Sequence, residues 1–146
     1  MTKLLIDECL SSELAFMARA RPSRGLACRV DWQVRLERRN IKRVLLDDDW
    51  VLVTKNSEDF RGPREAPGTK GQFADVVLHA GLICLNGPVG MDLALQRELF
   101  AETLDELDAD GDLTNQILEV TLEDSEASIQ VVRYTHPHAT DKTAKH

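Results

Sequence analysis

The sequence predicts a single α/β domain with a mainly parallel sheet, helices on both faces of the sheet and a C-terminal β-hairpin. Three short apolar runs support this fold class: residues 4–6, 51–53 and 82–85. Each run is continuous rather than alternating, which is typical of strands that are buried on both faces of a parallel sheet. Segments with apolar residues at helical spacing separate the runs, as expected for helices that cover such a sheet.

The other elements follow from local signals along the chain. Apolar residues at helical spacing predict four helices: residues 11–21, 36–46, 72–80 and 92–110. Ser11 or Ser12 is expected to cap the first helix, and Gly81 is expected to end the third in a left-handed conformation. Further strands are predicted at three segments, of which the last two would form the hairpin: residues 27–30, 117–122 and 129–134.

Length and composition bound the organisation of the chain. At 146 residues, 42% of them hydrophobic, the chain is expected to form one domain over residues 1–134, followed by a disordered tail over residues 135–146. The chain contains no run of about 18 apolar residues, so no membrane span is expected. The N-terminus lacks the pattern of a secretory signal. Three unclustered cysteines favour a reducing compartment, so we expect a cytoplasmic protein.

The formal net charge of −7 conceals an uneven distribution of charges. Residues 19–43 carry nine basic and two acidic side chains, whereas residues 92–126 carry twelve acidic side chains and one basic one. A local basic arm can hold a phosphate backbone even in an acidic protein. The acidic segment would suit a contact with a basic partner protein. The alternative for both segments is an ordinary solvated helix surface.

Polar side chains follow two of the predicted parallel strands at the point where each strand ends. Asp7 follows the first apolar run directly, and Thr54, Asn56 and Asp59 follow the run at 51–53. Open α/β sheets place their ligands at the carboxyl ends of their strands. If these two strands are neighbours, Asp7 and Asp59 come close together. Because hard oxygen ligands suit Mg²⁺ or Mn²⁺, the pair predicts a divalent-metal site.

Two motifs carry a resemblance to a known family. The N-terminal Leu-Leu-Ile-Asp-Glu-Cys-Leu-Ser and the later Val-Thr-Lys-Asn-Ser-Glu-Asp-Phe-Arg-Gly-Pro resemble the PIN-like proteins. Over residues 3–134 the chain is similar to small bacterial toxin components of toxin–antitoxin systems, which are relatives of the VapC-type ribonucleases. The resemblance implies a single Rossmann-like PIN domain and a nuclease activity that hydrolyses RNA with Mg²⁺ or Mn²⁺ as the cofactor.

The resemblance also implies roles for individual residues and for partners. Asp7 and Asp59 would hold the metal ion, and Asn56 and Thr54 would orient the ligands of the metal or the scissile phosphate. The implied partners are an RNA substrate, a small antitoxin protein and a second copy of the chain in a homodimer.

One position departs from the family pattern. In the similar proteins the helix predicted at 36–46 begins with an aspartate that points at the metal, and that position falls on Arg38 here. Glu37 lies one residue away, about 100° around a helix axis, and would take the acidic role if the start of the helix is shifted. Otherwise Arg38 would contact the substrate, and the chain would be a catalytically degenerate PIN-like module that binds RNA or an antitoxin without cleavage.

The glycine- and proline-rich segment 61–71 offers further candidates for phosphate contacts. Its basic residues Arg61, Arg64 and Lys70 belong to a predicted loop that leaves the carboxyl end of a strand. The same residues would also suit a plain connection with solvated cations.

Two other groups are expected to have no role in chemistry. His79 is expected to be structural or partly exposed, and His136 with His138 would not complete the coordination sphere of a metal ion. A receiver-type phosphate domain is a third interpretation of the whole chain, but no aspartate ends a strand at the phosphoacceptor position that a receiver requires.

Overall fold

The structure is a computed structural model that describes residues 2–20, 28–32, 38–88, 90–124 and 126–137. Within these residues, six strands form one sheet: β1 (Thr2–Ile6), β2 (Cys28–Trp32), β3 (Val51–Thr54), β4 (Leu82–Asn86), β5 (Gln116–Thr121) and β6 (Gln130–Thr135). Among the same residues, four helices accompany the sheet: α1 (Glu13–Ala20), α2 (Arg38–Asp47), α3 (Ser57–Arg61) and α4 (Leu93–Ala109).

The sheet is parallel except at one edge. Its strand order is β2-β1-β3-β4-β5-β6, and every neighbouring pair is parallel except β5 and β6, which are antiparallel. β1 and β3 are neighbours, with Leu4 opposite Val51 and Ile6 opposite Val53. The predicted α/β class with a mainly parallel sheet is therefore confirmed, and the adjacency of the first and third strands is confirmed with it.

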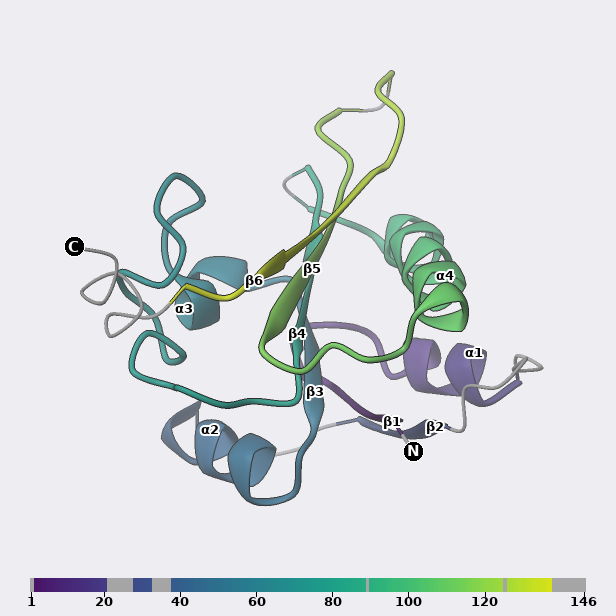
Figure 1. The fold of residues 1–146 in the computed structure, drawn as a ribbon. Coiled ribbons are helices and arrows are strands. Elements are labelled where there is room, and N and C mark those ends of the chain that lie inside the picture. The colour runs from purple at the N-terminus through teal and green to yellow at the C-terminus, as the bar shows by residue number, and fades with distance from the viewer. Residues whose placement is uncertain (1, 21–27, 33–37, 89, 125, 138–146) are drawn as a thin grey trace.

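Alternate residues of each strand point to opposite faces of the sheet, and each face has its own core. α1 and α4 cover one face, and α2 and α3 lie on the other (Figure 1). On β3, Val51 and Val53 pack in the core under α1 and α4, whereas Leu52 packs in the core on the side of α2 and α3. All three side chains are buried. A strand that is buried on both faces must be apolar at every position, which is why these runs do not alternate.

The helix termini follow the capping signals of the sequence. The Ser11 hydroxyl accepts a hydrogen bond of 3.1 Å from the backbone N–H of Glu13 at the start of α1. Asp92 caps α4, because its carboxylate accepts a hydrogen bond of 2.9 Å from the backbone N–H of Leu95. Among the described residues, the helices lack the combination of length and apolar character that a crossing of a bilayer requires.

The helix predicted over residues 72–80 is wrong, because this segment forms a series of turns. The backbone N–H groups of Gln72 and Phe73 bind the carbonyls of Asp59 and Phe60 in α3, so they hold the segment against that helix. Phe73 is buried, but Val77 is 63% exposed, although both would face the core on the expected helix. Gly81, with φ of +140°, precedes β4 and caps no helix.

Two further boundaries differ from the prediction. α3 was not predicted, and it includes Arg61, which was expected to lie in a loop. At the other end, Thr135 belongs to β6 and His136 is only 2% exposed, so the ordered chain extends past the predicted boundary at 134. His138 and the rest of the predicted tail lie outside the described residues.

Candidate functional site

Asp7 and the residues that leave β3 meet at the carboxyl edge of the sheet. Because β1 and β3 are parallel neighbours, Asp7, which directly follows β1, lies beside Thr54, the last residue of β3. The Thr54 hydroxyl donates a hydrogen bond of 2.8 Å to Asp7 Oδ2, and the backbone N–H of Asn56 donates one of 3.0 Å to Thr54 Oγ1. The structure thus joins three of the predicted site residues through hydrogen bonds.

The Asp7 carboxyl group is buried, only 4% exposed. The Cys9 thiol lies 3.3 Å from the same oxygen, Oδ2. Burial raises the pKa of Cys9, so the sulfur keeps its proton and can donate to the carboxylate. Within the described part of the chain, no lysine, arginine or histidine forms an ion pair with Asp7. A buried carboxylate with only neutral hydrogen-bond donors around it is expected to attract a cation.

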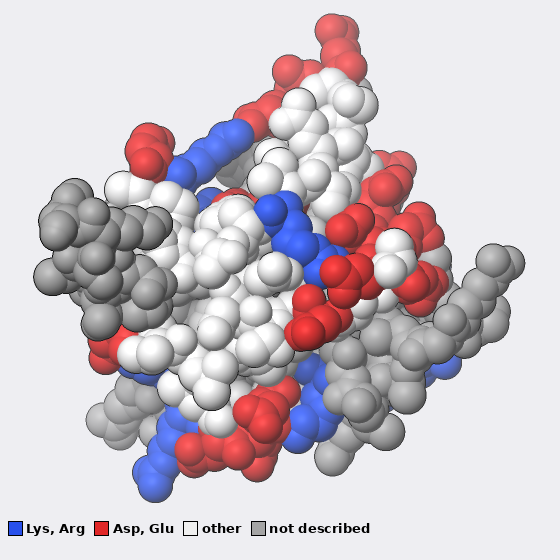
Figure 2. All heavy atoms as spheres, viewed as in Figure 1, with Lys and Arg blue, Asp and Glu red and all other residues white. Residues whose placement is uncertain are grey.

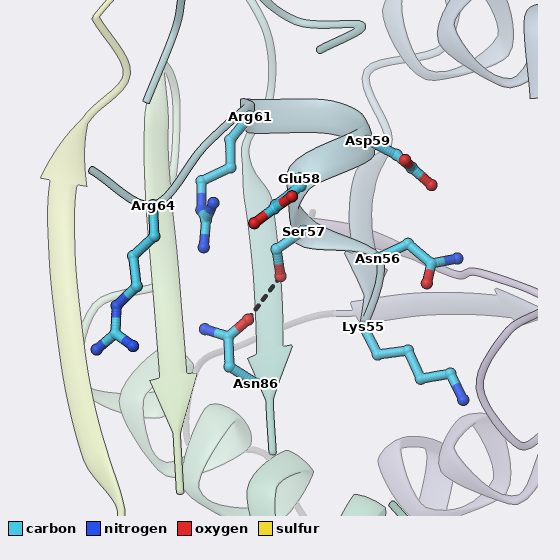
Figure 3. Close-up of a pocket in the computed structure, with 8 residues that line it drawn as sticks. All are labelled: Lys55, Asn56, Ser57, Glu58, Asp59, Arg61, Arg64 and Asn86. Carbon is cyan, nitrogen blue, oxygen red and sulfur yellow. Dashed lines mark hydrogen bonds between the residues drawn. The ribbon is translucent and has the colours of Figure 1, made fainter. Parts of the chain in front are cut away.

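A pocket of about 330 Å³, which we call the edge pocket, opens beside these residues. Figure 3 shows Asn56 and Asp59 on one side of α3, and Glu58 and Arg61 on the other side, where they face Asn86. The described residues that line the edge pocket are Lys55, Asn56, Ser57, Glu58, Asp59, Arg61, Arg64 and Asn86. Asp59 and Asn56 therefore share this pocket, and Asp7 is connected to it through Thr54 and Asn56.

Arg61 has a different environment from the one predicted. Its side chain is not solvated in a loop but buried, at 3% exposure, where it donates hydrogen bonds of 3.1 and 2.9 Å to the two carboxylate oxygens of Glu119. Burial opposes the charge of Arg61, but Glu119 outweighs this effect and raises the pKa of the guanidinium. Arg61 Nη1 also donates to the Gly62 carbonyl. This geometry gives Arg61 a structural partner on β5 in place of the predicted phosphate contact.

The remaining predicted residues lie elsewhere. Lys70 is exposed in the loop after α3 and is not among the described residues that line the edge pocket. Arg38 begins α2. Glu37 lies outside the described residues, so its predicted acidic role is neither placed nor removed.

Sequence reasoning missed several residues of the site. Asn86 ends β4 in the same way that Asp7 ends β1, so the rule of polar residues at strand ends would have found it. Ser57 and Glu58 were within reach of the same rule, because they follow Asn56 directly. Glu119 gave a weaker signal, a single carboxylate inside the apolar run of β5.

The fold and this site define an α/β protein with a mainly parallel sheet and a polar pocket at the carboxyl edge of that sheet. The chain is 56% identical over 87 residues to the uncharacterized protein y4eN of Sinorhizobium fredii, in an alignment that covers 58% of this chain and 84% of that protein. The chain therefore belongs to the family of y4eN. No model of a known protein family matches it, and no solved structure matches it significantly.

Proposed function

We propose that this chain is a PIN-like endoribonuclease that depends on a divalent metal ion, Mg²⁺ or Mn²⁺, at the carboxyl edge of β1 and β3. The observation that carries the proposal is the Asp7 carboxylate, which is buried, fixed by Thr54 and without an ion-pair partner in the described part of the chain. Its oxygens are the hard ligands that these ions prefer. Asp59 and Asn56, on one side of α3, supply the other candidate oxygen ligands.

Each of the site residues would have a distinct role in this reaction. Asp7 and Asp59 would hold the ion, which would supply charge neutralisation at the scissile phosphate. Thr54 holds the Asp7 carboxylate in place through its hydroxyl. Asn56 orients the substrate or the ligands of the ion from the wall of the edge pocket.

The resemblance of the two sequence motifs to PIN-like toxins extends the proposal to the biological role of the protein. The protein would be the toxin of a toxin–antitoxin pair, would act in the cytoplasm and would form a homodimer. Figure 2 shows acidic side chains gathered on the side of the molecule that carries α4, where Glu98 and Glu102 are exposed. A small antitoxin with a basic segment would complement this surface.

A second candidate function is a PIN-like module that binds RNA or an antitoxin without cleavage. The observation that favours it is the ligand count: among the residues that the structure describes, no three His, Cys, Asp or Glu side chains converge as a metal-ligand group. Arg38, where the similar proteins have an acid, favours it as well. The two candidates differ in whether the protein binds Mg²⁺ or Mn²⁺ at the edge pocket.

The test is cleavage of single-stranded RNA by the purified protein, with Mg²⁺ or Mn²⁺ and with EDTA. We expect cleavage that EDTA abolishes and that Asp7→Asn lowers by roughly 100-fold or more, because the variant removes a charged ligand of the ion. Glu98→Gln, which removes the same charge from the exposed face of α4, is expected to cleave at the wild-type rate.

Two results would contradict the nuclease proposal. Cleavage that persists in EDTA or in Asp7→Asn would exclude a metal site built on Asp7. Binding of RNA with no cleavage under any metal condition, together with no measurable Mn²⁺ affinity, would favour the module that binds without cutting.

A further inference from the structure

The orientation of the Asn86 side chain is fixed by its partners on β5. Asn86 ends β4, and its Nδ2 lies 3.1 Å from Glu119 Oε1 and 3.0 Å from Thr121 Oγ1. An ionised carboxylate only accepts hydrogen bonds, so the amide group that faces Glu119 must be the NH₂ group. Asn86 Oδ1 therefore points the other way, toward Ser57.

This orientation of the Asn86 amide requires an ionised Glu119, and the neighbours of Glu119 keep it ionised. Burial alone would raise the pKa of Glu119, but hydrogen bonds from Tyr134 and Arg61 outweigh burial and lower the pKa below its usual value. Tyr134 donates from its hydroxyl to Oε2, and burial beside Glu119 raises the pKa of this phenol, which keeps its proton. Glu119 is thus a permanent acceptor at neutral pH.

The direction of the next hydrogen bond follows from the orientation of Asn86. Ser57 Oγ lies 2.6 Å from Asn86 Oδ1, and because Oδ1 can only accept, the Ser57 hydroxyl must donate its proton to it (Figure 3). Ser57 Oγ, which also interacts with the buried Cys84 thiol, then has acceptor capacity toward the pocket, and Asn86 Oδ1 has one lone pair left. Both residues line the edge pocket.

This corner of the edge pocket therefore offers acceptors rather than donors. Glu58, whose carboxylate lies on the same side of α3 in Figure 3, adds further acceptor oxygens. Arg61 and Arg64 also line the pocket, where each is held in an ion pair, with Glu119 and Glu123 respectively. The ligand group that complements these lone pairs is a neutral hydrogen-bond donor such as a sugar hydroxyl.

We propose that Ser57 and Asn86 form a sugar-hydroxyl subsite that accepts a hydrogen bond from the 2′-hydroxyl of one ribose and so selects RNA over DNA. The 2′-hydroxyl is the group by which a protein distinguishes the two nucleic acids at a given position. The inference rests on the proposed function, since it assumes that a nucleic acid strand occupies the edge pocket. It adds the residues that recognise the sugar and the direction of the hydrogen bond.

The test is binding of short single-stranded RNA and DNA of the same sequence to the full chain in EDTA, so that neither metal nor cleavage contributes. We expect the wild-type protein to bind RNA about 5- to 10-fold more tightly, the worth of one hydrogen bond. Ser57→Ala is expected to lose this preference by weakening RNA binding while DNA binding is unchanged. Ser128→Ala, at an exposed serine in the β5–β6 connection, is expected to keep the preference.

A change in the ligand supplies a control that leaves the protein unaltered. Replacing each ribose of the RNA in turn by deoxyribose is expected to weaken wild-type binding at one position and to have no effect there with Ser57→Ala. Equal affinities of the wild type for RNA and DNA, no binding of either, or an equal loss for both in Ser57→Ala would overturn the subsite. A preference for RNA without any cleavage in Mg²⁺ would instead overturn the nuclease proposal alone.

Discussion

The imidazole of His79 is buried, at 5% exposure, and packs against two other rings. Its centroid lies 4.9 Å from that of Phe73 and 5.4 Å from that of His136. Within the described part of the chain, neither of its ring nitrogens has a hydrogen-bond partner. Burial, with a smaller effect of His136, lowers the pKa of His79 to about 4. His79 is therefore neutral in the folded protein at neutral pH.

This lowered pKa predicts a loss of stability in mild acid. The unfolded chain takes up the proton of His79 near pH ~6.5, before the folded protein does, so the neutral ring stabilises the fold above that pH. The contribution is lost as the pH falls from 6.5 toward 4, by up to about 3 kcal/mol. We expect the free energy of unfolding by urea to fall less steeply between pH 7 and pH 4.5 in His79→Leu than in the wild type. Equal slopes would contradict the assignment, whatever the stability of the variant at pH 7.

At the scale of elements, the strands could be predicted and the segment after α3 could not. Burial on both faces of the sheet requires a continuous apolar run, so the local sequence is sufficient to predict β3 and β4. Residues 72–80 contain Phe73 and Val76 at helical spacing, but their conformation depends on hydrogen bonds to α3. A local pattern carries no information about partners that are supplied by the tertiary fold.

The C-terminal end of the described chain lies against the loop that follows α3, and Gly68 permits this contact. Gly68 has φ of +89°, and a Cβ atom placed there would lie 1.7 Å from the Pro137 carbonyl oxygen. Gly90 has a similar φ of +78°, but a Cβ atom there would meet no atom of the described residues within 4 Å. Both glycines have φ in the left-handed region, but only at Gly68 would a Cβ atom meet a described atom.

Substituting each glycine by alanine therefore separates the effect of backbone strain on the unfolding free energy from the effect of the steric contact with Pro137. Gly90→Ala is expected to cost about 1 kcal/mol of unfolding free energy, the penalty for a left-handed residue with a Cβ atom. Gly68→Ala is expected to cost at least about 2 kcal/mol more, because Pro137 must move away. Urea denaturation of both variants measures the difference. Equal losses would show that the segment around Pro137 does not dock on this loop in solution.

For the whole molecule, the sequence could predict which strand ends meet but not which charges pair. Neighbouring parallel strands end at the same edge of a sheet, and this rule predicted that Asp7, Thr54 and Asn56 would lie close together. The structure joins these three residues by hydrogen bonds. Arg61 and Glu119 are 58 positions apart in the chain, and nothing near either residue indicates the other. The predicted basic arm at 19–43 falls largely outside the residues whose side chains are described.

The Arg61–Glu119 pair links α3 to β5 inside the protein, and its removal is expected to affect the stability of the entire fold. Arg61→Met leaves a buried carboxylate without its cation and is expected to cost about 3–5 kcal/mol. The double variant Arg61→Met/Glu119→Leu removes both charges, so it is expected to be more stable than the single variant. Arg64 and Glu123 supply a matched control, because their ion pair is exposed to solvent.

Arg64→Met is expected to cost no more than about 1 kcal/mol, since solvent screens an exposed pair. Urea denaturation of the four proteins at neutral pH gives the comparison directly. If Arg61→Met and Arg64→Met lose the same free energy of unfolding, the Arg61 guanidinium is not buried against Glu119. The orientation of Asn86, and with it the direction of the Ser57 hydrogen bond, would then lose its physical basis, because both depend on an ionised Glu119 held between Arg61 and Tyr134.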